Sequence, residues 1–204
     1  MKTLISIDGG MSSGIIVGTY SDDTPFELTH AFQIEGGVEG FIRNVHHYDD
    51  TDSFSDGGTC FAVDHHSGSW AKGICHWYGD ILGRDEIEEP TFLVEKFTAR
   101  GAAAGPFALR TSALEPLRIE GAILAMGITP TWVSPQQQYF LPGESKAKKK
   151  QAQHKWLREN GYAIMPKDLG TKDADDARSA CAHAISWLRK FHKPTQDMFR
   201  KESK

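Results

Sequence analysis

The chain has 204 residues, of which 39% are hydrophobic and 25% charged, enough apolar material for one sizeable core. Its three cysteines form no CxxC pair, and a reduced intracellular setting is expected. No basic segment followed by a long apolar one opens the chain, and no apolar run approaches the roughly 20 residues of a membrane span. We therefore expect a cytoplasmic protein without a membrane partner.

Charge is distributed unevenly along the chain. The formal net charge is −4, but residues 1–100 carry 6 Lys and Arg against 17 Asp and Glu, and residues 101–204 carry 17 against 10. A basic half beside clustered acids suits a protein that holds a polyanion near a metal site. The alternative interpretation is a solvated surface with uneven charge.

The N-terminal stretch predicts an antiparallel meander. Residues 4–8 are apolar up to Asp8, a glycine-rich turn follows at residues 9–14, and the apolar run 15–20 heads back. Residues 26–34 alternate apolar and polar side chains, which is typical of a half-buried third strand. Apolar spacings of three and four at residues 38–45 indicate a short helix.

Residues 46–89 are the least legible stretch. Residues 49–58 form a loop by composition, residues 60–63 suit a short strand, and residues 74–82 suit a helix. The stretch also holds the residue types of a zinc site, namely His46, His47, His65, His66, His76, Cys60 and Cys75. Their spacings match no standard zinc pattern, so surface or partly buried histidines are the preferred interpretation.

From Pro90 onward, strands alternate with helices. We predict strands at residues 91–95 and 131–134, and helices at 114–126, 145–160 and 173–191. Pro194 is expected to stop the last helix, leaving residues 192–204 as a loose basic tail. Three antiparallel strands followed by this alternation predict an α/β fold, with residues 1–191 as one domain around a mixed sheet covered by helices on both faces.

Four acids occur where strands end or a helix begins. Asp8 and Glu95 close short apolar strands, and Asp173 and Asp176 open the last predicted helix, three residues apart on one face. Helix capping alone would explain the last two. If all four meet at one sheet edge, they would repel unless divalent cations neutralise them, and oxygen ligands suit Mg²⁺ or Mn²⁺. Two such ions about 4 Å apart can hydrolyse a phosphodiester.

These motifs resemble the RuvC-type Holliday junction resolvases of the ribonuclease H-like superfamily. The stretch 7–14, with Asp8 followed by Gly10 and Gly14, looks like the family's first-strand motif. Residues 92–95 look like its fourth-strand acid motif, and residues 173–177 are similar to its last motif. The resemblance implies a ribonuclease H-like mixed five-stranded sheet, with residues 46–89 as an insertion. This insertion makes the chain look like a diverged phage or mobile-element member, from a bacterium or a phage-infected host cell.

The activity implied by the resemblance is a crossover junction endodeoxyribonuclease. Such an enzyme is a homodimer that uses two Mg²⁺ or Mn²⁺ ions per active site and nicks two symmetric strands of a four-way DNA junction. On that interpretation Asp8, Glu95, Asp173 and Asp176 are the catalytic metal ligands. Asp175 competes with Asp173 for the fourth place, but it is turned about 100° from Asp176 along a helix.

Candidate DNA contacts come from a basic helix and one aromatic residue. Residues 145–160 have one face of lysines, namely Lys146, Lys148, Lys149, Lys150 and Lys155. These side chains would neutralise phosphates, although a solvated helix face is the alternative. Phe97 is the nearest candidate for the aromatic residue that the family places after its fourth-strand acid, and its alternative role is in the core. Arg110 and Arg118 are weaker candidates.

Two other functions fit parts of the pattern. The turn after Asp8, with Ser12 and Ser13, would also suit the phosphate-gripping hairpin of actin-like and sugar-kinase-like phosphotransferases. Those proteins pair two such domains, and no second Asp-Gly hairpin appears later in this chain. A non-catalytic protein that binds branched DNA is the other alternative, and the presence of all four acids speaks against it.

Overall fold

The computed structural model describes residues 1–43, 60–64, 69–73, 90–97, 111–143, 145–162 and 175–201. Within these ranges seven strands form one sheet in the order β5-β4-β3-β2-β1-β6-β7. The strands are β1 (Lys2–Asp8), β2 (Ser12–Tyr20), β3 (Glu27–Glu35), β4 (Cys60–Asp64), β5 (Ser69–Gly73), β6 (Thr91–Glu95) and β7 (Thr131–Val133). The helices are α1 (Gly37–Arg43), α3 (Thr111–Ala125), α4 (Lys146–Glu159), α5 (Asp175–Leu188) and α6 (Lys193–Lys201).

Strand directions follow the predicted plan. Strands β1, β2 and β3 form an antiparallel meander, whereas β6 pairs with β1 and β7 pairs with β6 in parallel. The five strands β3-β2-β1-β6-β7 therefore form the predicted five-stranded mixed sheet. The structure adds β4 and β5, which extend the sheet beyond β3. Of the insertion's predicted elements, the strand near residue 60 is confirmed, and the helix at 74–82 lies outside the described residues.

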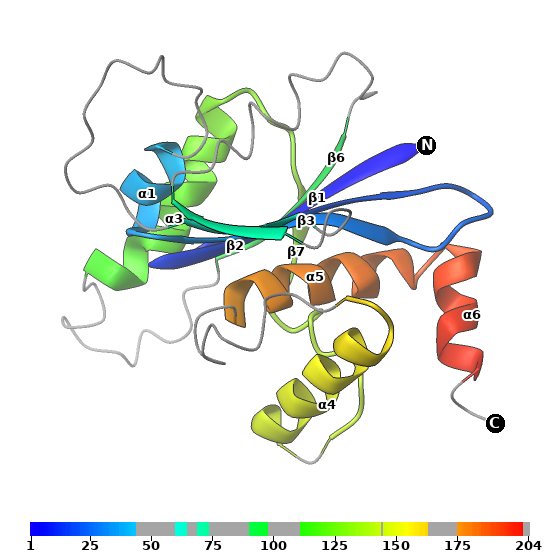
Figure 1. Ribbon diagram of the computed structural model, residues 1–204. Helices are drawn as coiled ribbons and strands as arrows, with labels where there is room; N and C mark the ends of the chain where they lie inside the picture. The colour runs from blue at the N-terminus through cyan, green and yellow to red at the C-terminus, as the bar shows by residue number, and fades with distance from the viewer. Residues whose placement is uncertain are drawn as a thin grey trace.

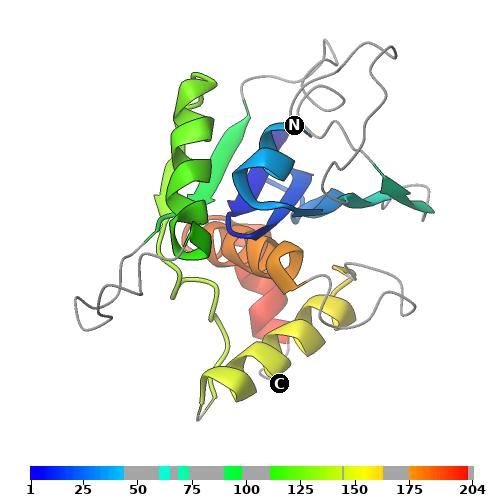
Figure 2. The same ribbon diagram turned by 90° about the vertical axis from the view of Figure 1, so that its left-hand side faces the viewer.

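Two apolar cores, one on each face, hold the sheet between helices. Residues that alternate along a strand point to opposite faces, so Ile5 and Ile7 of β1 join α1 and α3, while Leu4 packs against α4 and α5. Figures 1 and 2 show α1 and α3 on one side of the sheet and α5 with α4 on the other. The predicted coverage of both faces is confirmed.

The C-terminal end differs from the expected loose tail. Residues 193–201 form α6, and Met198 and Phe199 pack against the core beside α4 and α5. The Phe199 ring stacks on Trp156 at 4.6 Å between centroids. Pro194 lies in the first turn of α6, where a missing N–H leaves no helical hydrogen bond unmade, so it permits a helix start as well as a stop. Aromatic packing thus orders most of a segment whose sequence alone is strongly polar.

No helix within the described ranges is both long enough and apolar enough to cross a membrane.

Candidate active site

Two parallel strands place Asp8 and Glu95 next to each other. Strands β1 and β6 pair with Ile7 opposite Val94, so the residues that follow lie at the same end of adjacent strands. Leu4 and Leu93 both lie in the core beneath α5. Asp8 follows Leu4 by four residues and Glu95 follows Leu93 by two, so strand alternation directs both acids to that same face of the sheet. Asp8 and Glu95 are each partly buried at the carboxyl end of their strands.

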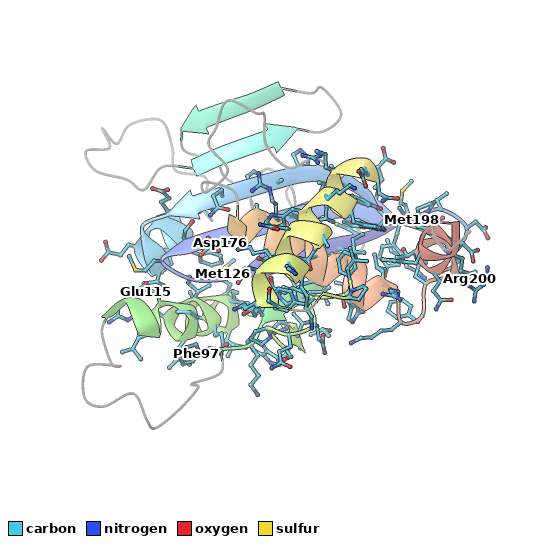
Figure 3. All side chains as sticks on the ribbon, turned by 90° about the horizontal axis from the view of Figure 1, so that it is seen from below. Phe97, Glu115, Met126, Asp176, Met198 and Arg200 are labelled. Atoms are coloured by element: carbon cyan, nitrogen blue, oxygen red, sulfur yellow. The ribbon has the colours of Figure 1, made fainter. Side chains whose placement is uncertain are left out.

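The start of α5 brings Asp176 to the same place through an unusually close approach to β2. A Cβ atom on Gly14 would lie 2.0 Å from the backbone carbonyl carbon of Asp176, so only glycine fits there. On the facing side of the helix, Ala177, Ala180 and Ala184 are fully buried, and their small side chains let α5 lie flat on the sheet. Figure 3 shows Asp176 at the start of α5, close to α4.

Gln33 ties the first turn of α5 to β3. Its side-chain amide nitrogen donates to Asp176 Oδ2 at 2.9 Å and to the Ser12 hydroxyl, and its oxygen accepts the Ala177 backbone N–H at 2.9 Å. Because Gln33 is only 2% exposed, these hydrogen bonds are shielded from water. The position of the Asp176 carboxylate is therefore determined from both the helix and the sheet.

The three carboxylates act on one another electrostatically. The pKa of Asp8 is raised well above its usual value, first by burial and then by the negative charges of Glu95 and Asp176. A hydrogen bond from the Ser179 side chain and the positive charge of Lys150 oppose this rise. The site thus concentrates more negative charge than its protein surroundings neutralise.

A buried histidine on α5 contacts the second strand acid. His183 Nε2 lies 2.6 Å from Glu95 Oε2, and the His183 side chain is fully buried, whereas that of Glu95 is 19% exposed. Sequence reasoning missed His183, Ser179 and Gln33. A signal existed for Ser179 and His183. They follow Asp176 by three and seven residues, so they are polar residues on a helix face that otherwise carries small apolar ones.

Helix α4 presents lysines toward the acids along the same side that packs on the core. At about 100° per residue, Lys146, Lys149 and Lys150 fall on the side of the helix that carries the buried Trp156 and Leu157 further along. A different set, Lys148 and Lys155, is turned about 180° from Lys146 and is exposed. The predicted single face of five lysines is therefore wrong, because helical geometry divides them between two sides.

A groove joins Glu95 to two of these lysines, Lys146 and Lys149. It has a volume of about 540 Å³ and runs from Glu95 to Ser145, Lys146 and Lys149 at the start of α4. The turn after β7 forms its wall, with Pro135, Gln136, Gln138 and Tyr139. A chain of phosphates lying in this groove would meet positive charge at one end and the Glu95 carboxylate at the other.

The remaining predicted contacts have mixed positions. Phe97 is partly buried, and its backbone N–H donates to Glu120 of α3; Figure 3 shows it beside that helix. Arg118 pairs with the buried Glu115 at 2.6 Å on the opposite face of the sheet from the acids. Asp173 and Arg110 lie outside the described residues, as do Cys75 and the five histidines that were considered for a zinc site.

The donor set suits a hard divalent cation in chemistry and charge. All three acids offer oxygen ligands, and their mutual repulsion at Asp8 is what a cation would relieve. Among the side chains that the structure describes, no group of three or more His, Cys, Asp or Glu residues is arranged to hold a metal ion. A complete coordination shell would therefore need a further ligand or a shift of these side chains.

Fold and site together define an α/β domain built on a mixed sheet, with acids at the ends of β1 and β6 and at the start of α5. The chain is similar to the solved structure of "T. thermophilus RuvC in complex with Holliday junction substrate", with a TM-score of 0.48 and 14% identity over 93% of this chain and 96% of that one. No protein-family model and no curated protein matches the sequence.

Proposed function

We propose that the protein is a divalent-metal-dependent endonuclease that hydrolyses phosphodiesters in branched DNA, with four-way junctions as its main substrate. The observation that carries this proposal is the convergence of Asp8, Glu95 and Asp176 beside a lysine-lined groove. Carboxylates gathered at one sheet end with nearby cationic side chains suit a reaction on a polyanion at a metal site.

The acids would hold Mg²⁺ or Mn²⁺, and Asp173 is the proposed fourth ligand. Two ions in such a site activate the attacking water and stabilise the leaving oxygen of a phosphodiester. The protein's own part is to hold the carboxylates in place: Gln33 orients Asp176, and a Ser179 hydrogen bond reaches Asp8. Strong desolvation around Asp8 strengthens every charge interaction there.

The start of α4 is suited to bind the DNA backbone. Ser145 caps the helix by accepting the Lys148 backbone N–H, and the first turn contains no acid. Lysines in this first turn add positive charge to the positive end of the helix dipole. This arrangement destabilises the helix when no anion is bound and favours the binding of an anion. Lys146, Lys149 and Lys150 are therefore the proposed phosphate contacts nearest the acids, Lys148 and Lys155 are proposed for more distant DNA, and Phe97 is the proposed aromatic contact with the junction.

A second copy of the chain would supply the second nick. Helix α3 exposes Leu117 and Leu124, each at least 50% accessible and seven residues apart on one side of the helix. Gly121 lies between them, and no atom of the described residues lies within 4 Å of where its Cβ would be, so another helix could approach closely. We propose that two chains pair through this face, which carries none of the three described acids.

The function is tested by incubating labelled four-way, flap, duplex and RNA–DNA hybrid substrates with the protein, with and without Mg²⁺ or Mn²⁺. We expect cleavage of the four-way junction in symmetrically related strands, only with metal, and none by Asp8→Asn. Junction binding without cleavage in Mn²⁺ would instead support a non-catalytic binding protein. Cutting that does not require the metal would contradict the proposal.

A further inference from the structure

A row of three polar side chains runs along the face of α5 that covers the acids. Asp176, Ser179 and His183 follow one another at spacings of three and four, so they lie on one side of the helix. Each meets the acidic site differently: the first is an acid, the second hydrogen bonds to Asp8, and the third contacts Glu95. The remaining residues of this face, such as Ala180 and Ala184, are small and apolar.

The contact between His183 and Glu95 has a defined direction. A carboxylate oxygen only accepts hydrogen bonds, so His183 Nε2–H is the donor to Glu95 Oε2 across 2.6 Å. The other ring nitrogen, Nδ1, is buried and has no hydrogen-bond partner among the described residues. A buried polar ring with a single partner costs stability, so its placement calls for an explanation other than packing.

We propose that His183 is a positioning residue, which holds the Glu95 carboxylate at the angle needed to bind the divalent cation. The proposal rests on the metal-dependent function above. Glu95 ends a strand and is partly exposed, so its carboxylate would rotate freely without a fixed partner. The hydrogen bond from a fully buried ring on α5 removes that freedom and leaves the second oxygen, Oε1, for the metal. Groups that orient metal ligands in this way typically affect metal affinity or activity by about 10–100-fold.

Three substitutions separate the hydrogen bond from packing. His183→Gln places an amide N–H near the position of Nε2 and keeps the donor to Glu95. His183→Asn places its amide near Nδ1 and cannot reach Glu95, and His183→Met keeps the volume without a donor. A matched control is His192→Met in the turn between α5 and α6, because His192 is also buried and bonds to Thr195 and to the Ser21 carbonyl instead.

The readout is Mn²⁺ affinity measured directly by calorimetry on the folded variants without DNA, with thermal unfolding measured in parallel. We expect His183→Met and His183→Asn to weaken Mn²⁺ binding by about 10–100-fold, and His183→Gln to stay within a few-fold of the wild type. His192→Met is expected to lower the melting temperature without changing Mn²⁺ affinity. In a Glu95→Gln background, His183→Met should cause no further loss.

Several outcomes would overturn the inference. The first is a wild-type Mn²⁺ affinity in His183→Met. The second is an equal loss of Mn²⁺ affinity in His183→Met and His192→Met. The third is that His183→Met lowers Mn²⁺ affinity in the Glu95→Gln background as much as it does in the wild type. If His183→Met does not fold, His183→Gln and His183→Asn give the same comparison, and equal Mn²⁺ affinity in these two contradicts the proposal. Failure of the nuclease function is distinguishable, because the wild type itself would then bind no Mn²⁺ and cut no junction.

Discussion

The two faces of the sheet have equally well-buried apolar cores, but they differ in the polar groups that those cores contain. On the side of α1 and α3, Ile5, Ile7, Phe92 and Val94 meet helix residues such as Ile123 in an apolar cluster. On the side of α5, the same two strands supply Asp8 and Glu95, and the helix adds Ser179 and His183. The core on the α1 and α3 side is therefore apolar, whereas the α5 side also contains carboxylates that repel one another.

Glu115 supports this contrast, because it is a buried acid on the first face whose carboxylate is paired with a positive charge and a backbone N–H. Its carboxylate accepts the Val38 backbone N–H at 2.7 Å and pairs with Arg118 at 2.6 Å. It thereby caps the start of α1, where anions are favoured. Among the described residues, Lys150 is the positive charge that lowers the pKa of Asp8, and burial together with the charges of Glu95 and Asp176 outweighs it.

The largest expected effect is the loss of cleavage when a site acid is neutralised. Asp8→Asn, Glu95→Gln and Asp176→Asn should each lower the cleavage rate of a four-way junction by at least roughly a hundredfold, because each removes an anionic metal ligand. Junction binding measured in the absence of divalent cation should stay within a few-fold. Glu115→Gln is the matched control, and a similar loss of cleavage there would erase the distinction between the faces.

Loss of core volume on the α3 side should affect stability alone. Ile123→Ala removes a fully buried side chain and should cost about 2–5 kcal/mol in the free energy of unfolding. Urea denaturation measures this loss, and cleavage per folded molecule should be unchanged. A selective loss of cleavage at temperatures where the variant is fully folded would show that the α3 side also shapes the site.

Gly14→Ala should disturb the acid site from the sheet side. The new methyl group would lie 2.0 Å from the Asp176 backbone, so the first turn of α5 must move away from β2. We expect at least a tenfold loss of cleavage, roughly the effect of a small misplacement of a catalytic group. Wild-type cleavage by this variant would contradict the close approach of α5.

The lysines on the two sides of α4 should differ in how much they contribute to the salt dependence of junction binding. Replacing Lys146, Lys149 and Lys150 with Gln should lower the slope of log affinity against log salt by roughly 2–3, since each phosphate contact contributes about 0.9 for duplex DNA. Replacing Lys148 and Lys155 should change it less. Junction titrations at several salt concentrations measure both slopes, and equal changes would contradict the division into two sides.

The smallest expected effect is a gain in stability from the Asp8→Asn substitution. Because the folded pKa of Asp8 is raised, its contribution to stability is present below the unfolded pKa near 4 and is lost as pH rises through the folded value. At pH 7–8 without divalent cation, Asp8→Asn should therefore melt a few degrees higher than the wild type. Mn²⁺ should then stabilise the wild type and not the variant, as melting curves will test.

Local pattern was enough to predict most elements and to single out Asp8, Glu95 and Asp176. Strand alternation and the Asp8 and Glu95 positions depend on neighbours in sequence, and β1, β6, α3, α4 and α5 all lie close to their predicted bounds. Partners brought together by tertiary structure were not predictable in this way. Gln33 contacts Asp176 from 143 residues away, and His183 contacts Glu95 from 88 residues away.

The missed helix α6 has a similar cause. Its sequence is polar and contains a proline, and local signals therefore favoured a tail. Its order comes from Phe199 stacking on Trp156 and from the Arg189 guanidinium, which lies 4.3 Å from the centre of the Phe199 ring. Burial of one aromatic ring between distant helices is not visible in a sequence window.

The side-chain amide of Gln33 links the Asp176 carboxylate and the Ala177 backbone to β3. Hydrolysis of that amide to the acid, or its replacement by Glu, would exchange one NH₂ for an oxygen of nearly the same size. The Ala177 N–H would keep its acceptor, but two oxygens that only accept protons would then face each other at the Asp176 carboxylate. Deamidation at this one position would thus add a further negative charge beside Asp176, in a site where Asp8, Glu95 and Asp176 already act on one another.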